Sequence, residues 1–309
     1  MGRGDPSDVE WERLRPFLPV SNRPCGRWRD HRQVIDGILH RVRTGVQWRD
    51  LPERFGPWKT VYERHRLWSG DGTWERLLQQ AQAAADAAGE IDWDISVDST
   101  IGRVHQRAAG ARTDPPPALR PQKGPSRQNI RAKPRGRARP PAGGGAGGEG
   151  LGRLRGGFTT KLHLSADCHS RPLSLIVTPG QRADCTQFKP VLEKIRVPKL
   201  GPGRPRKKPE SVAADKAYSN GPCRDYLRQR GIQHTIPEKT DSQAARLRKG
   251  SRGGRPPGFD EERYNKRNTV ERAINRFKQY RAVATRYDKR RYVYLGTATV
   301  AALAIWLRI

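Results

Sequence analysis

The segment at residues 264–278, YNKRNTVERAINRFK, carries two separate stripes of side chains. At about 100° per residue, with Tyr264 at zero, its apolar positions fall within one sector of roughly 180–280°. A sector of that width is typical of a helix face packed on a hydrophobic core. We therefore predict an amphipathic helix whose buried face consists of Val270, Ala273, Ile274 and Phe277.

A polar stripe runs along the edge of this apolar face. Arg267 falls near about 300°, Glu271 near about 340° and Lys278 near about 320° from Tyr264 on the same wheel. A carboxylate flanked by two cations and a phenol suits a site that binds both a metal ion and a phosphate backbone. An exposed ion pair between Arg267 and Glu271 would show the same spacing and would contribute only about 0.2–0.5 kcal/mol. Both interpretations stay open at this point.

The first ninety residues follow a helical pattern. We predict one helix at residues 31–45 with Gly45 as its C-cap, and a second, basic helix at residues 58–72. Helix, short connection and basic helix is the outline of a helix-turn-helix, although other small helical bundles share it. On the second helix we expect three cations to face outward and contact DNA: Lys59, Arg64 and Arg66. The tryptophans here are expected in the core: Trp28, Trp48, Trp58, Trp68 and Trp74.

Beyond residue 90, strand and helix patterns alternate, which predicts a mixed α/β sheet with flanking helices. The predicted strands are residues 92–100, a hairpin at 158–167 and 171–179, 211–214, and 233–236. Residues 111–150 are dominated by Pro, Gly and Arg and have too little apolar surface to offset the entropy of ordering them. We thus expect a helical DNA-binding domain at 1–90 and an α/β domain at 91–309, with a disordered insertion at 111–150.

The charge of the chain indicates its partner. Its 309 residues include 61 Lys and Arg against 31 Asp and Glu, a formal net charge of +30. Such an excess points to nucleic acid. A membrane surface would also attract it, but the basic residues are spread over the chain and not gathered on one amphipathic helix.

The cysteines and apolar runs bear on the compartment. Four widely spaced cysteines form no C-x-x-C pair, which argues against a zinc site and a disulfide framework. The start of the sequence lacks the apolar run of a signal peptide. We expect a cytoplasmic protein. The apolar stretch at residues 292–309 is marginal in length for a bilayer, and we expect it to be a terminal helix docked on the core.

The predicted strands and helix would bring three carboxylates together as candidate metal ligands. Asp98 and Asp215 are expected at strand ends, and Glu271 lies on a helix that would cover them. Such oxygen ligands can hold two Mg²⁺ ions roughly 3.5–4 Å apart, an arrangement suited to phosphoryl transfer. Asp92 and Asp94 are alternatives to Asp98, although solvated or capping roles fit them better.

Two histidines, His105 and His163, could support that site, but a structural role is the commoner one for a histidine on a strand or loop.

At these residues the chain resembles the DDE transposases of bacterial insertion sequences, of the insertion sequence four and five groups, whose catalytic domain is ribonuclease-H-like. Their last motif has Tyr, two residues, Arg, three residues, Glu, six residues and Lys, which this chain matches at Tyr264, Arg267, Glu271 and Lys278. The segments VDST, with Asp98, and ADKAY, with Asp215, look like the first two motifs. The central hairpin and residues 8–78 are also similar to family members. The insertion at 111–150 looks longer than the family usually carries.

The resemblance implies an enzyme that binds the inverted repeats at the ends of a mobile element, cleaves the DNA there and joins the freed 3′ hydroxyl to target DNA. It implies catalytic, metal-binding roles for Asp98, Asp215 and Glu271, with Mg²⁺ as cofactor and Mn²⁺ as a substitute. Tyr264, Arg267 and Lys278 would hold phosphates. Double-stranded DNA is the implied partner, and action on two ends implies a dimer in the DNA complex.

Two other functions are compatible with parts of the pattern. A DNA-binding protein derived from such an element would keep the basic surface without cutting, but a decayed copy is expected to lose carboxylates. A glycosidase with two carboxylates would not need a charge of +30 and leaves the cationic stripe unexplained.

Overall fold

The computed structural model describes residues 6–19, 29–109 and 148–308. The N-terminal part is helical, as predicted: α1 (Asp8–Leu14), α2 (His31–Thr44), α3 (Trp58–Gly70) and α4 (Thr73–Ala87), with 3-10 turns η1 (Arg15–Phe17), η2 (Trp48–Asp50) and η3 (Glu53–Phe55). Trp68 and Trp74 are buried and Trp48 and Trp58 pack partly buried against the same core, whereas Trp28 lies outside the described residues.

Local sequence explains the limits of α2. The Asp30 side chain accepts hydrogen bonds from the N–H groups of Arg32 and Gln33, which satisfies two donors that the first turn leaves free. At the other end Gly45 adopts a left-handed conformation with φ of 73°. A Cβ there would also lie 2.9 Å from Cβ of Arg281. Glycine is therefore required at this C-cap, which confirms the prediction.

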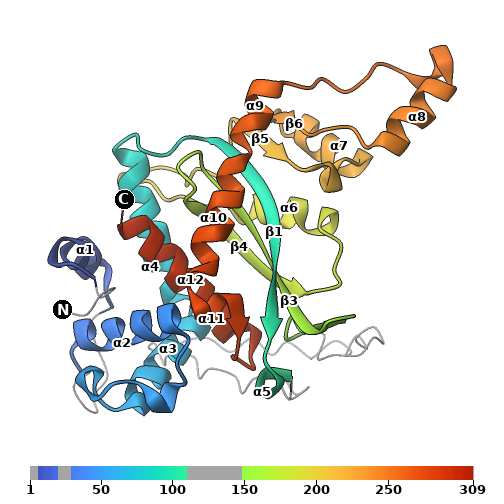
Figure 1. Cartoon of the computed structure of the whole chain (residues 1–309). Coiled ribbons are helices and arrows are strands. Elements are labelled where there is room, and N and C mark those ends of the chain that lie inside the picture. Colours follow the sequence, from blue (N-terminus) through green and yellow to red (C-terminus); the bar gives the residue numbers. More distant parts are fainter. Residues whose placement is uncertain (1–5, 20–28, 110–147, 309) are drawn as a thin grey trace, which may run out of the picture.

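A mixed sheet forms the rest of the molecule (Figure 1). Its strands are β1 (Asp94–Val104), β2 (Gly152–Leu154), β3 (Gly157–Ala166), β4 (Pro172–Pro179), β5 (Ser211–Ala214), β6 (Gln233–Thr235) and β7 (Thr285–Arg286). β5 and β7 run parallel to β1, and β6 runs parallel to β5. β3 pairs antiparallel with β1, β2 and β4. This confirms the predicted mixed α/β sheet, including the β3–β4 hairpin.

Helices lie on the sheet and beside it. They are α5 (Gln106–Ala109), α6 (Cys185–Glu193), α7 (Gly221–Gln229), α8 (Thr240–Arg248), α9 (Glu261–Lys266), α10 (Asn268–Lys278), α11 (Arg281–Ala284) and α12 (Arg291–Leu307), with 3-10 turns η4 (Lys216–Tyr218) and η5 (Gly250–Gly253). α10 packs on β1 and β3, and α6 packs on β3 and β4. Figure 1 shows α9 and α8 at one end of the molecule and α2, α3 and α5 at the other.

The last helix joins the N-terminal part to the sheet. α12 is buried along most of its length and packs on α2, α3, α4 and β4. This confirms the docked terminal helix. In the part of the chain that the structure describes, no helix is both long and apolar enough to cross a bilayer.

A buried polar chain crosses this junction. Arg41 on α2 pairs with Asp288 at 3.2 Å, and both side chains are at most 5% exposed. The Thr297 hydroxyl of α12 donates to Asp288 at 2.9 Å and lies 3.2 Å from Nε2 of His65 on α3. The helices of the two predicted domains thus share one core and one polar network.

The end of the predicted insertion is ordered. Most of residues 111–150 fall outside the described part, but residues 148–150 form a turn in which Glu149 is buried. The buried Arg286 donates to the Glu149 and Gly150 carbonyls, at 2.8 and 3.3 Å. The Glu149 carboxylate accepts from the N–H of Arg291, at 2.7 Å. The expectation of disorder is therefore wrong for this last turn, because long-range contacts that composition does not reveal hold it.

We predict that stability falls in mild acid because of two buried histidines. Burial lowers the pKa of His65 and of His163 to about 4 in the folded chain, against an ordinary value of about 6.5 when unfolded. Below that value the unfolded chain binds more protons, so this stability is complete above about pH 6.5 and is lost as pH falls towards 4. Each histidine should cost at most about 1.4 kcal/mol per pH unit.

Urea unfolding between pH 7 and pH 4.5 measures this dependence. His65→Gln should reduce the slope of the free energy of unfolding against pH by the contribution of one titrating histidine. An unchanged slope in that variant would show that His65 binds protons equally in the folded and the unfolded chain, which contradicts the prediction.

Candidate active site

Two neighbouring parallel strands place Asp98 and Asp215 side by side. β1 and β5 pair up to Val97 and Ala214, so the following residues lie at the same level of the sheet. Adjacent strands are about 4.8 Å apart. Asp215 follows β5 directly, as predicted, and its side chain accepts from the N–H of Lys216 at the start of η4.

Asp98 lies inside its strand and not at the end. β1 continues past it to Val104, because the pairing with β3 extends along this whole stretch. Successive side chains of a strand point to opposite faces. Asp98 therefore faces α10, and Ser99 faces the start of α6.

α10 brings Glu271 over these aspartates. Its predicted apolar face is buried: Val270, Ala273, Ile274 and Phe277 are at most 7% exposed. The predicted single helix is nevertheless divided at Arg267, which ends α9 and precedes α10. Around it the N–H groups of Arg267 and Val270 bond to carbonyls three residues back, at 2.9 and 3.0 Å. The helix tightens there while staying right-handed.

Arg267 lies between two of the three carboxylates. Its Nη2 donates to Oε1 of Glu271 at 2.7 Å, and its Nη1 lies 4.0 Å from Oδ2 of Asp98. The Arg267 side chain is 16% exposed, against 25% for Asp98 and 48% for Glu271. The i,i+4 ion pair between Arg267 and Glu271 that the sequence indicated is thus present, and it lies at the edge of a cluster that includes Asp98.

The electrostatics of Asp98 reflect this cluster. Burial raises the pKa of Asp98, while the N–H of Ser99 and the guanidinium of Arg267 act in the opposite direction. The nearby negative charges of Asp215 and Glu271 raise the pKa further. Three carboxylates within electrostatic range of one another favour a bound cation, which would offset their repulsion.

The donor set suits a hard divalent ion. The three side chains offer only carboxylate oxygens, which are among the ligands that Mg²⁺ and Mn²⁺ prefer. Within the described ranges, no three His, Cys, Asp or Glu side chains are yet close enough together to hold a metal ion. In this arrangement the Glu271 carboxylate is hydrogen-bonded to the Arg267 guanidinium, at 2.7 Å. The chemistry of the three side chains nevertheless fits a divalent ion.

The other two residues of the polar stripe flank Glu271. The Tyr264 ring on α9 lies 5.3 Å from the Arg267 guanidinium carbon, a cation–π distance. Lys278 is the last residue of α10, exposed, and about 10 Å along the helix from Glu271 at 1.5 Å per residue.

The expectation for the basic helix α3 is partly wrong. Lys59 is exposed, and Arg66 is partly exposed and pairs with Glu63 at 2.9 Å. Arg64 is only 7% exposed, against the prediction that it faces outward. It lies 3.1 Å from Nδ1 of His31 and over the Trp68 ring. Its position, one helical turn after a buried valine and one before Trp68, places it on the buried face.

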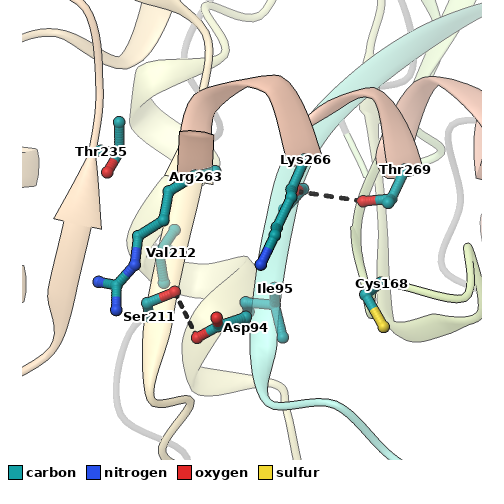
Figure 2. A pocket seen from close by; sticks show the side chains of 11 residues that line it. Asp94, Ile95, Cys168, Ser211, Val212, Thr235, Arg263, Lys266 and Thr269 are labelled. Carbon is teal, nitrogen blue, oxygen red and sulfur yellow. Dashed lines mark hydrogen bonds between the residues drawn. The ribbon is translucent and has the colours of Figure 1, made fainter. Parts of the chain in front are cut away.

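The two alternative first ligands have structural partners of their own. The Asp94 carboxylate accepts from the Ser211 hydroxyl at 2.6 Å, across the β1–β5 pair (Figure 2). Asp92 accepts from the N–H of Asp94 at 2.8 Å, a capping contact. In the same view Thr269 of α10 points towards β1, where its hydroxyl lies 3.4 Å from that of Ser96.

A second carboxylate network on the opposite face was not predicted. Oδ1 of Asp184 accepts from the Ser99 hydroxyl at 2.6 Å and lies 3.0 Å from Nζ of Lys161 and 3.7 Å from Nδ1 of His163. Burial raises the pKa of Asp184, but the hydrogen bonds from Ser99 and Lys161 outweigh it, so the pKa lies below its ordinary value. This network fixes the residue next to Asp98.

The histidines differ in their relation to the carboxylates. His163 donates to or accepts from the Thr178 hydroxyl at 2.8 Å and faces Asp184, behind the Asp98 face. His105 stacks on Tyr287 at 4.4 Å, beyond the end of β1. Ser99 pairs with His163 across β1 and β3. This strand register could have indicated that His163 lies near Asp184, the partner of Ser99.

Two family models match this chain. "Putative transposase of IS4/5 family (DUF4096)" matches residues 7–78, and "Transposase DDE domain" matches residues 92–307. The second includes Asp98, Asp215 and Glu271.

Several bacterial proteins are similar to parts of this chain. A protein of Brucella ovis named "Putative transposase for insertion sequence element IS6501" is 29% identical over 151 residues, which are 49% of this chain and 100% of that protein. The uncharacterized protein y4sN of Sinorhizobium fredii is 39% identical over 106 residues, 34% of this chain and 81% of the relative. An uncharacterized 16.2 kDa protein of insertion element IS402 from Burkholderia cepacia is 33% identical over 105 residues, 31% of this chain and 71% of the relative.

Among solved structures, a Mos1 transposase paired-end complex with the left transposon end is 12% identical, with 90% of this chain and 86% of that chain covered and a TM-score of 0.23. The match of the second model extends over well over half of the 309 residues. The chain therefore belongs to the transposase DDE domain family.

Proposed function

We propose that this chain binds the terminal inverted repeats of an insertion sequence, cleaves the DNA at the ends of the element and joins the freed 3′ hydroxyl to target DNA. The observation that carries the proposal is the convergence of Asp98, Asp215 and Glu271 from β1, β5 and α10 around Arg267. Membership of a DDE transposase family supports DNA transposition in general.

The three carboxylates would hold the divalent metal that such a family implies, two Mg²⁺ ions or Mn²⁺ in their place. When bound, the ions stabilise the charge that develops on the attacking and leaving oxygens. Asp98 lies on β1 and Asp215 directly follows the adjacent strand β5, so the pairing of these strands keeps their spacing fixed. The attacking group is water or a 3′ hydroxyl, so no side chain of the protein needs to form a covalent bond with DNA.

The cations beside the carboxylates would position the DNA. An incoming phosphate offers Arg267 a new anionic partner, and the exchange frees Glu271 to approach the aspartates. Tyr264 would hold the Arg267 side chain, and exposed Lys278 would contact a phosphate further along the strand. On α3, Lys59 and Arg66 remain candidates for contact with the terminal repeat, while buried Arg64 supports the helix. Cleavage at two ends would use a dimer.

A cleavage assay tests the proposal. Purified protein is incubated with Mg²⁺ or Mn²⁺ and an end-labelled duplex that carries the terminal repeat of its own element, and in parallel with a shuffled duplex. We expect a nick at the boundary of the repeat in the first duplex only. Binding without any nick, under either metal, would favour a DNA-binding protein that no longer cuts.

Lys278→Ala is expected to weaken binding to the repeat and to reduce its salt dependence. A lost phosphate contact lowers the slope of log K against log salt by about 1, because one fewer counterion is released. Fluorescence anisotropy between 50 and 200 mM salt, about the range in which such effects are large, measures this slope. Lys189→Ala, an exposed lysine on α6, is the control and should leave the slope unchanged. Equal slopes for Lys278→Ala and wild type would remove Lys278 from the DNA interface.

A further inference from the structure

A cavity of about 510 Å³ lies at the junction of the N-terminal helices with the segment after β7. It is lined by residues from α2, η2, α3, α5 and the stretch that leads into α12, among them Arg49, Trp58, Arg107, Tyr287 and Lys289. Its volume is within the range of about 300–1,000 Å³ that small-molecule sites occupy.

Flat aromatic rings form much of the lining. Trp48 lies 5.5 Å from Tyr62 between ring centroids, and Trp58 contributes a third ring. Tyr287, from the segment after β7, also lines the cavity; it is 36% exposed and stacks on His105 at 4.4 Å. Rings supported from behind in this way offer stacking surface at little cost in conformational entropy.

Cations accompany the rings. The Arg49 guanidinium carbon lies 5.7 Å from the Trp58 ring, and Nη1 of Arg107 donates to Oε1 of Gln47 at 2.9 Å. The charge of the acidic lining residue, Asp288, is balanced by Arg41 at 3.2 Å, and its carboxylate also accepts a hydrogen bond from Thr297. The cavity therefore combines π-faces with net positive charge.

We propose that this cavity binds an unpaired nucleotide of the DNA, with the base stacked on Tyr287 or Trp58 and the phosphate on Arg49, Arg107 or Lys289. This inference rests on the proposed function. Aromatic rings beside cations are the combination that single-stranded nucleic acid requires, since every base has a π-face and every linkage a phosphate. Bases within a duplex are stacked on each other and cannot enter a concave site.

The position of the cavity fits a role close to the cleaved end. Tyr287 follows β7, which pairs with Arg103 and Val104 at the end of β1. Tyr287 stacks on His105, which is seven residues after Asp98, or about 23 Å at 3.3 Å per residue. Figure 1 places α2 and α3 at this end of the sheet, away from α9. A strand whose phosphate lies at Asp98 would reach the cavity within about seven nucleotides at 3.4 Å each.

Fluorescence anisotropy without added metal tests the site separately from cleavage. Three labelled DNA probes of 12 nucleotides per strand are compared: a single strand, the same strand with abasic positions, and the corresponding duplex. For the single strand we expect Tyr287→Ala and Trp58→Ala to weaken binding about 5- to 100-fold, the loss of one stacked base. Binding of the duplex and of the abasic strand should be unchanged.

Two further variants separate stacking from unfolding. Tyr287→Phe keeps the ring and should bind the single strand like wild type. Tyr226→Ala, on α7, removes a partly exposed tyrosine that also has cations near it, Lys189 at 5.6 Å and Arg230 at 5.7 Å, but lies outside the cavity. It should have no effect. An equal loss for Tyr226→Ala, or for the duplex and the abasic strand, would overturn the proposal, and so would wild-type binding by both alanine variants. The binding of the single strand is measured without metal and does not depend on cleavage, so a protein that fails to cleave DNA could still show it.

Discussion

Glu271→Gln is expected to abolish strand cleavage and to leave binding of the terminal repeat nearly unchanged. Glutamine keeps the size of the side chain and its position on α10 but removes the charge that a divalent ion requires. Loss of several kcal/mol of stabilisation of the transferring phosphoryl group corresponds to a fall of at least about 10³-fold in rate. Binding should survive, because contacts between cations and phosphates dominate affinity.

Glu193→Gln on α6 is a matched control for this experiment. Glu193 is 48% exposed, as Glu271 is, and has an i,i+4 cation partner, Lys189 at 3.8 Å. That variant should cleave like wild type. Gel-based nicking and anisotropy on the same protein preparations give both readouts. Cleavage by Glu271→Gln at a wild-type rate would exclude Glu271 from the catalytic set, whatever its place in the sequence motif.

Asp288→Ala is expected to lower the free energy of unfolding by about 3–5 kcal/mol. The substitution leaves the Arg41 guanidinium, 3% exposed, without its carboxylate and removes the acceptor of the Thr297 hydroxyl. An unpaired buried charge carries a penalty of that size, whereas an exposed pair contributes little. Urea unfolding followed by circular dichroism at pH 7 measures the change.

Two comparisons make this prediction specific to burial. Asp225→Ala removes the partner of Arg228 in an exposed pair on α7 and should change stability little. The double variant Arg41→Met with Asp288→Leu replaces both charges by apolar groups and should recover most of the loss. If the double variant is as unstable as Asp288→Ala, packing and not the buried charge determines the effect.

The pair also connects two parts of the fold. Arg41 belongs to α2 and Asp288 precedes α12, so the pair joins the helical N-terminal part to the segment between the sheet and the last helix.

Local pattern was sufficient for much of the candidate site. The spacing of Glu271 and Lys278 follows the 3.6-residue period of a helix, and the buried face of α10 agrees with it, whereas Tyr264 lies on α9, before the division at Arg267. Asp215 follows a short apolar strand that is recognisable from four residues. Gly45 ends α2 because a left-handed C-cap favours glycine, which is again a local rule.

Contacts between distant residues decided the rest. Arg64 is a cation in sequence, yet packing of α3 against α2 buries it beside His31 and Trp68. Asp184 meets Ser99 only because β1 and α6 come together, 85 residues apart along the chain.

What the sequence by itself determined is the family, the helical start, the mixed sheet and the spacing of the polar stripe, since each rests on periodicity or on short motifs. Only the tertiary structure decided that Arg267 lies between Asp98 and Glu271, that α12 unites the two parts, and that Trp58 and Tyr287 line one cavity. The physical reason is that burial, ion pairing and concavity depend on which surfaces meet, and the intrinsic preferences of single residues do not specify those meetings.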